Sequence, residues 1–238
     1  MEDRKARHIR TGTILVAILA LGLMPASYSP AVASDEERVQ LLVDRARITF
    51  NDFMSDRYYS WLHDNIKNAK GVLIFPQVIK GGFIFGASGG TGVFLARDEK
   101  TGNWSEPAFY TVGSGTFGLQ IGGESAQVVM LAMTQKAIDS VLSSSFKLGA
   151  DGSVALGPVG AGGKAQADIP SVTADFLTFS KEKGLYAGLN LEGAVIAVRD
   201  SMNKTYCRRD VRPADIIVKS ACSNRGADQL REALKKAA

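Results

Sequence analysis

Histidine is nearly absent from this 238-residue chain, which contains only His8 and His63. A Ser-His-Asp or Cys-His nucleophile would have to use one of these two, and a site of several histidine ligands is excluded. His63 follows the run YYSWL, which is typical of a packed or surface histidine rather than a catalytic base. The acidic residues form no paired motif, so an enzyme that uses Ser or Asp without histidine is the weaker alternative. We expect no enzymatic activity and no cofactor.

A long apolar span and a strong charge excess are also missing. The uncharged run Thr11–Met24 is shorter than the roughly 20 residues of a membrane span. It follows four basic residues and precedes Ala31-Val32-Ala33, which predicts a secretory signal peptide over residues 1–33. The remainder has 28 − 4 = 24 basic and 24 − 2 = 22 acidic residues, too balanced for a dedicated nucleic-acid binder. We expect an exported protein, periplasmic or secreted, with peripheral membrane attachment as an option.

Cysteine is scarce, and both residues, Cys207 and Cys222, lie near the C-terminus. In an oxidising compartment a pair at this separation can close a disulfide loop. The alternative is two unrelated buried thiols. No histidine lies nearby, so the case for a zinc site is weak, and we predict no metal.

Glycine, by contrast, is abundant, and 18 of the 25 fall between Gly81 and Gly163. A phosphate loop requires G-x-x-x-x-G-K-[ST], but the segment ending at Gly163-Lys164 has Pro158 and Ala165 at two defining positions. The dinucleotide fingerprint fails as well, because Gly90-Thr91-Gly92 continues to Leu95. Nucleotide binding is therefore not expected. Glycines dispersed through strand-like runs instead indicate bulges, bends and close backbone approach.

The helices are indicated by caps and by apolar spacing. Ser34 and Glu37 have capping-box spacing at the start of a stretch with an apolar face of Val39, Leu42, Val43, Ala46, Phe50 and Phe53. Further helices are predicted over Tyr58–Lys70 and Thr134–Ser144, and a polar helical tail over residues 225–238.

The rest of the chain is strand-like. Asp98–Trp104 is predicted to be a hairpin turn, and residues 174–198 a second hairpin that turns at Lys181–Gly184. Pro76 and Pro107 are expected at strand ends or edges. Together these signals predict one α+β domain over residues 34–224, with a strongly bent, barrel-like antiparallel sheet, N-terminal amphipathic helices and one mid-chain helix.

Three segments, NAKGVLIFPQVIKGGFIFGASGGTGVFLAR, TGNWSEPAFY and GLQIGG, resemble the SYLF domain of eukaryotic endocytic proteins and secreted bacterial proteins. The resemblance runs from about residue 40 to about residue 220. The matching positions are Gly71, Pro76, Lys80, Phe83, Gly90, Gly92, Arg97, Trp104, Pro107, Gly118 and Gln120. NKTY (203–206) and ADII (214–217) resemble the end of the module, although Cys207-Arg208 stands where the bacterial pattern usually has Tyr-Gly.

The resemblance implies binding of phosphoinositides or other anionic phospholipids, without enzyme activity. Some eukaryotic members are described as actin-binding, but an exported chain would not meet actin in its own cell. The alternative is a structural or protein-interaction module of the bacterial envelope that has no lipid affinity.

A lipid site is predicted on the first helix and the basic residues near it. One interpretation of this helix is core packing, and the other is insertion of its apolar side chains between lipid headgroups. For insertion, the candidate residues are Val39, Leu42, Val43, Phe50 and Phe53 as apolar contacts, and Arg38, Arg45, Arg47, Lys67, Lys70, Lys80 and Arg97 as headgroup contacts.

Overall fold

The computed structural model of the chain describes residues 33–82, 85–117, 122–157, 159, 174–182 and 191–238. The predicted signal peptide, apart from Ala33, lies outside the described residues. The main helices are α1 (Asp35–Ser55), α2 (Ser60–Asn65), α3 (Gln135–Leu142), α4 (Asp200–Cys207), α5 (Pro213–Ile217) and α6 (Asp228–Ala237). Short 3-10 turns are η1 (Arg57–Tyr59), η2 (Ile66–Asn68) and η4 (Arg225–Ala227).

The strands form one curled sheet in the order β5-β8-β3-β2-β1-β4-β7-β6. Their bounds are β1 (Gly71–Gly82), β2 (Phe85–Ala96), β3 (Ala108–Phe117), β4 (Gly122–Ala132), β5 (Ser145–Lys147), β6 (Val154–Leu156), β7 (Phe176–Glu182) and β8 (Val195–Val198). Neighbours are antiparallel except for the parallel pair β6–β7. The predicted α+β class and strongly bent sheet are therefore confirmed, with one parallel pair that was not expected.

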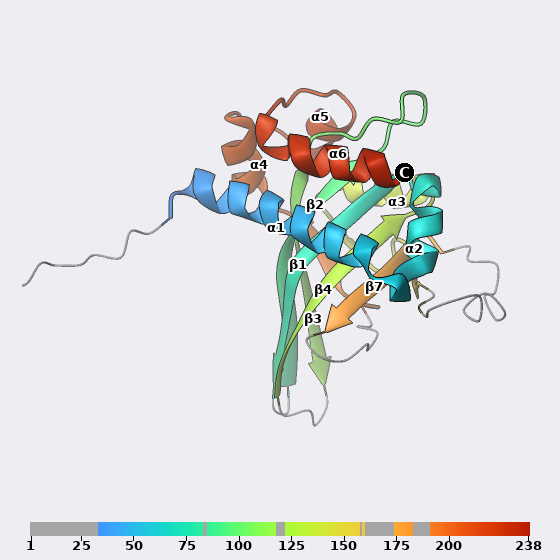
Figure 1. The fold of residues 1–238 in the computed structure, drawn as a ribbon. Helices are drawn as coiled ribbons and strands as arrows, with labels where there is room; N and C mark the ends of the chain where they lie inside the picture. Colours follow the sequence, from blue (N-terminus) through green and yellow to red (C-terminus); the bar gives the residue numbers. More distant parts are fainter. Residues whose placement is uncertain (1–32, 83–84, 118–121, 158, 160–173, 183–190) are drawn as a thin grey trace, which may run out of the picture. The chain divides into compact units, whose positions relative to one another are not determined.

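Helix α1 begins where the capping box predicts. The Glu37 amide donates to Ser34 Oγ at 3.2 Å, and the Ser34 amide donates to Glu37 Oε2 at 2.8 Å. The buried face of α1, which includes Val43 and Phe50, packs on β1, β2 and β4. Figure 1 shows α1 crossing these strands beside α6, while β1 to β4 extend beyond the helices at one end.

The sheet is covered on both faces near its helical end, as two consecutive residues of β3 show. The ring of Phe109 lies 5.3 Å from that of Tyr206 in α4. The Tyr110 hydroxyl donates to the Val141 carbonyl of α3 at 2.8 Å, and therefore on the opposite face. The side chains on both faces of β3 are thus buried, and helices cover both faces of the sheet here.

Pro76 is located inside β1, not at a strand end or edge as predicted, although Pro107 does precede β3. Against β2, Phe75 and Pro76 lie opposite a single residue, and against β4 the same is true of Pro76 and Gln77. Proline has no amide proton to donate, so a bulge accommodates it in a central strand.

Two further arrangements differ from those expected, although the predicted turn at Lys181–Gly184 lies partly outside the described residues. Strands β7 and β8 do not form a hairpin, because each pairs with a different side of the β1–β4 block, β7 with β4 and β8 with β3. The C-terminal helix exists, but it is no separate tail. Leu230 and Leu234 of α6 are buried, and residues 33–238 form one unit. Sequence spacing alone carries no signal for either arrangement.

The cysteine pair predicted near the C-terminus is bonded in the structure, where Cys207 at the end of α4 is joined to Cys222. The closed loop contains α5. Cys222 is buried, so the disulfide fastens the segment after α5 to the body of the domain.

Asp175 joins three elements through its buried carboxylate. It accepts hydrogen bonds from the Thr134 hydroxyl, which caps α3, at 2.5 Å, and from the Ser153 amide and hydroxyl at 2.9 and 2.8 Å. Burial alone would raise the pKa of Asp175, but these bonds and the nearby Lys136 lower it to about 2.

We predict that Asp175→Asn lowers the free energy of unfolding by roughly 1–3 kcal/mol at pH 7, since charge-assisted hydrogen bonds are lost. Because the pKa of Asp175 is lower in the folded than in the unfolded state, its ionisation stabilises the fold fully when the pH is above the unfolded-state pKa of about 3.9. This contribution disappears as the pH falls through the folded-state pKa of about 2. Urea unfolding at pH 7, 4 and 2.5 should therefore show the difference from wild type shrinking at low pH. Asp139→Asn, on the exposed side of α3, is the control, and an equal loss there would contradict the assignment.

Gly92 and Gly115 provide a second test position and its control. A Cβ at Gly92 would lie less than 3.0 Å from the Ile74 carbonyl oxygen and the Phe75 ring beside the bulge, whereas nothing lies within 4 Å at Gly115. Gly92→Ala should cost roughly 1–3 kcal/mol by overpacking, and Gly115→Ala should be neutral or slightly stabilising. Thermal unfolding of the two variants checks this, and equal melting temperatures would refute the close-packing role of Gly92.

Candidate functional site

The exposed side of α1 carries a stripe of alternating basic and aliphatic residues. Arg38, Leu41, Arg45 and Ile48 are spaced by three or four residues, so they share one helix face. Leu41 and Ile48 are 48% and 50% exposed, whereas the apolar residues on the other face of the same helix fill the core. We call these four residues the α1 stripe.

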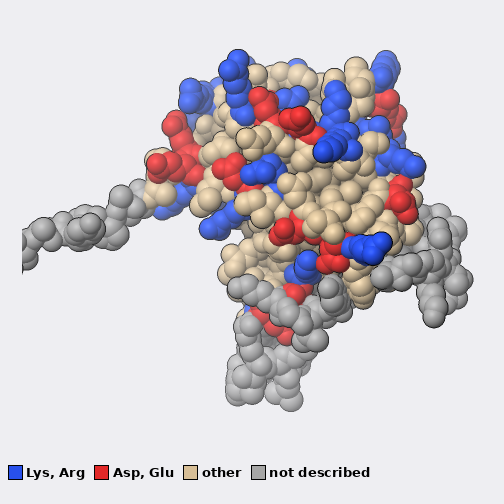
Figure 2. Space-filling model, in the orientation of Figure 1, with Lys and Arg blue, Asp and Glu red and all other residues tan. Residues whose placement is uncertain are grey.

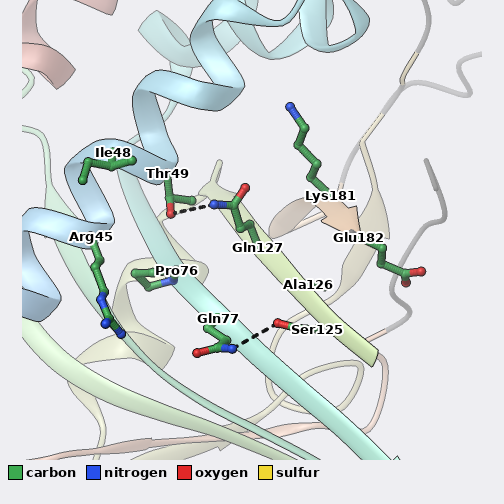
Figure 3. A pocket seen from close by; sticks show the side chains of 10 residues that line it. All are labelled: Arg45, Ile48, Thr49, Pro76, Gln77, Ser125, Ala126, Gln127, Lys181 and Glu182. Carbon is green, nitrogen blue, oxygen red and sulfur yellow. Dashed lines mark hydrogen bonds between the residues drawn. The ribbon is translucent and has the colours of Figure 1, made fainter. Parts of the chain in front are cut away.

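A groove of about 500 Å³ lies beside the stripe, where α1 crosses the bulge of β1. It is lined by residues of α1, β1, β4 and β7, namely Arg45, Ile48, Thr49, Pro76, Gln77, Ser125, Ala126, Gln127, Lys181 and Glu182. Figure 3 shows Arg45 extending from the helix toward the strand that carries Pro76 and Gln77. We call this space the bulge groove.

Uncharged polar side chains form the floor of the bulge groove. Gln127 donates to the Thr49 hydroxyl at 3.4 Å, and Gln77 donates to the Ser125 hydroxyl at 3.2 Å (Figure 3). Gln127 is the residue that lies opposite the bulge of β1. The bulge therefore places amide side chains at a surface where a bound chain could exchange hydrogen bonds with them.

The charges of the groove differ in their pairing. Lys181 forms an ion pair with Asp56 at 2.9 Å, and this hydrogen bond, with that from the Tyr58 amide, lowers the pKa of Asp56. Arg45 has no ion-pair or hydrogen-bond partner among the described residues. Its guanidinium is thus available to an acidic group of a partner.

The predicted apolar contacts are mostly in the core. Val39, Val43, Phe50 and Phe53 are at most 3% exposed, and Leu42 is half-buried against the same cluster. Since these side chains hold α1 on the sheet, the structure favours the core interpretation of this face. The exposed aliphatic residues are Leu41 and Ile48, which sequence reasoning missed. Their seven-residue spacing, in step with Arg38 and Arg45, was the available signal.

The predicted basic residues do not form one surface. Lys67, Lys70 and Arg97 lie together where β1 begins, and there Arg97 donates to the Lys67 carbonyl and Lys70 pairs with Glu99. The others are separate. Lys80 pairs with Glu124 of β4 at 3.7 Å, and half-buried Arg47 lines a hollow between α1 and α6. Figure 2 likewise shows acidic and basic side chains interspersed over the face that it draws.

Nothing in the described part of the chain resembles a catalytic or metal centre. His63 donates from Nε2 to the Phe53 carbonyl at 2.9 Å, and so caps the last turn of α1. No group of three or more His, Cys, Asp or Glu side chains that could hold a metal ion occurs among the described residues. Across the same residues, every helix is too short or too polar to span a bilayer.

These features define an α+β domain with an exposed stripe and a groove formed by a helix and a bulged strand. Residues 113–237 match the Ysc84 family, described as "Las17-binding protein actin regulator". The chain belongs to this family, which confirms the resemblance to the SYLF domain, the same module.

Two relatives illustrate the family. The chain is 32% identical over 170 residues to SH3 domain-containing YSC84-like protein 1 of Homo sapiens, covering 71% of this chain and 49% of the relative. It is 36% identical over 146 residues to LAS seventeen-binding protein 3 of Saccharomyces cerevisiae, covering 60% and 31%. The chain thus spans at most about half the length of these relatives. The name of the yeast relative describes a binding protein, and the family description names an actin regulator. These descriptions favour the protein-interaction alternative over lipid binding.

Proposed function

We propose that this domain is a non-enzymatic protein-interaction module whose docking surface is the α1 stripe together with the bulge groove. The observation that carries the proposal is the pair Leu41 and Ile48, which are half-exposed on a helix whose other face is fully packed. Arginine is enriched at protein interfaces, and exposed apolar side chains between arginines fit the apolar core of such a surface. Membership of a family described as actin regulators supports a protein partner.

The partner surface that fits is acidic and partly apolar. Arg45 offers an unpaired guanidinium, and Gln77 and Gln127 offer amides to main-chain or polar groups. The aliphatic residues of the stripe would fill small pockets on the partner. Because the groove is open and polar, it suits a folded surface or an extended segment better than an apolar small molecule.

Binding to anionic phospholipid is a second candidate, favoured by the same stripe. Arg38 and Arg45 would contribute about 1 kcal/mol each at an anionic surface. Leu41 and Ile48 are already half-buried, so their insertion would add about 1 kcal/mol each. A total of about 4 kcal/mol gives weak, reversible attachment. On the face drawn in Figure 2, acidic and basic side chains of the described residues are mixed, and no broad cationic surface there would strengthen it.

One set of variants separates these candidates. In co-sedimentation with actin filaments, wild type should bind, and Arg45→Glu combined with Ile48→Asp should bind at least about tenfold more weakly, as expected when interface anchors are lost. The control combines Lys100→Glu with Leu156→Asp, two exposed positions outside the α1 stripe and the groove. Phosphatidylcholine vesicles with and without anionic lipid form the parallel arm.

Each result has a distinct meaning. Filament binding that the stripe variant loses and the control keeps would support the protein surface. Binding only to anionic vesicles, lost in the same variant, would support the second candidate. Equal behaviour of the stripe variant and the control would show that this surface is not the docking site.

We also propose that the chain is exported, on the basis of the basic start and the apolar run Thr11–Met24. Fractionation of a bacterial host should then place the protein outside the cytoplasm, with a mature N-terminus at Ser34 found by N-terminal sequencing. An intact N-terminus on a cytoplasmic product would contradict export. If the chain is exported, the natural partner lies outside the cytoplasm, and actin serves as a probe of the family's affinity.

A further inference from the structure

A second cavity, of about 670 Å³, lies away from the α1 stripe. The lining includes the turn after β2 and the segment from α5 to Ser223. Trp104, Glu106 and Arg231 also line it. This volume is in the range of sites that hold a small organic ligand.

The floor of the cavity is fixed by a hydrogen-bond network around Glu106, which is 8% exposed. Glu106 accepts from the Tyr206 hydroxyl at 2.8 Å, the Asn224 amide at 3.3 Å and Arg231 Nη1 at 3.4 Å. Arg231 Nε also donates to the Trp104 carbonyl at 2.9 Å. The site is therefore rigid before any ligand arrives, which reduces the ordering cost of binding.

Two buried donors of the cavity residues lack acceptors. Trp104 is 2% exposed, and its Nε1 donates to no acceptor among the described residues. The same is true of Arg97 Nε, and Arg97 faces Trp104 across an isolated β-bridge. A buried donor left unpaired costs about 1–3 kcal/mol. A ligand that shifted these two side chains enough to bring an acceptor to their buried nitrogen atoms would recover that energy.

The charges of the cavity leave one cation without a partner. Lys70 pairs with Glu99, and Arg231 pairs with Glu106. Arg97 donates to the Lys67 carbonyl but pairs with no carboxylate among the described residues. Asp98 also lines the cavity, and the amides of Lys100 and Thr101 donate to its carboxylate. Arg97 is therefore the one lining cation without a carboxylate partner among the described residues, and a single cation suits one negative charge better than a phosphate dianion.

The part of the lining that comes from α5 and Val218 is aliphatic. Val218 is 65% exposed, the largest exposed fraction among the large hydrophobic residues that the structure describes, and half-buried Ile217 lies beside it. The bond between Cys207 and Cys222 closes the loop that carries both side chains. An apolar chain could pack against this wall while its polar end reached Arg97.

We propose that this cavity binds a small aliphatic carboxylate, with the carboxylate on Arg97 and Trp104 and the chain against Ile217 and Val218. The chemistry is shared by free short-chain fatty acids and by the C-terminus of a peptide that ends in an aliphatic residue. The site is separate from the docking surface proposed above, and neither depends on the other.

The two tryptophans provide a direct test with octanoate as the probe. In ¹H–¹⁵N spectra of the full chain, Trp61→Phe assigns the remaining indole signal to Trp104, because Trp61 packs on Phe179 elsewhere. Octanoate should shift the Trp104 signal saturably and leave that of Trp61 in place. Octanamide, which lacks the charge, should bind about tenfold more weakly.

Arg97→Gln should weaken octanoate binding about tenfold, while Lys100→Gln, an exposed residue of the same turn that does not line the cavity, should leave it unchanged. If Arg97→Gln does not fold, Val218→Asp at the exposed rim gives the same information, since its charge repels the carboxylate. Tighter binding of N-acetyl-leucine than of octanoate would identify a peptide terminus, and the reverse a fatty acid. No saturable shift, or equal binding of octanoate and octanamide, would overturn the proposal.

Discussion

Pro76 imposes the constraint on which much of the domain depends. It interrupts the hydrogen-bond ladder of the central strand on both sides, so β2 and β4 must each adjust to an extra residue. Glycine is required at positions 90 and 92 of β2, because a side chain at either would collide with a carbonyl oxygen of β1. The same bulge leaves Gln127 facing α1, where it bonds Thr49, and creates the hollow beneath the helix. Packing and the candidate docking surface thus share one local irregularity.

Helix α1 carries two distinct patterns in one sequence. Val39, Val43, Phe50 and Phe53 hold the helix to the sheet, and Leu41 and Ile48 remain half-exposed among arginines. The first set of residues stabilises the fold by packing in the core. The second set does not pack in the core, so the fold does not require aliphatic side chains there. The α1 stripe of the proposed docking surface therefore lies on a helix face outside the core. The region of this family member that matches the human relative covers about half of that relative's length.

Local signals in the sequence were sufficient for local structure. The capping box at Ser34 and Glu37, the cap of α3 at Thr134 and the turn at Asp98 all formed as expected, because each depends on neighbours within a few residues. Pairings over longer distances were not predictable from a single sequence. The apolar run of β7 is equally compatible with a hairpin to β8 and with its actual partner β4. The apolar face of α1 was recognised, but periodicity cannot distinguish a core from a membrane as the surface that buries it. The exposed stripe becomes visible only when the buried face is known.

The two ends of the sheet order, β5 and β6, also limit how the domain can be recognised. Each is three residues long, and the short segment between them carries the chain from one end of the order to the other. These two end strands therefore offer an incoming peptide only a few residues on which to extend the sheet. A partner that met the domain at β5 or β6 would be selected mainly by side-chain chemistry, which can change through single substitutions while the backbone scaffold stays the same.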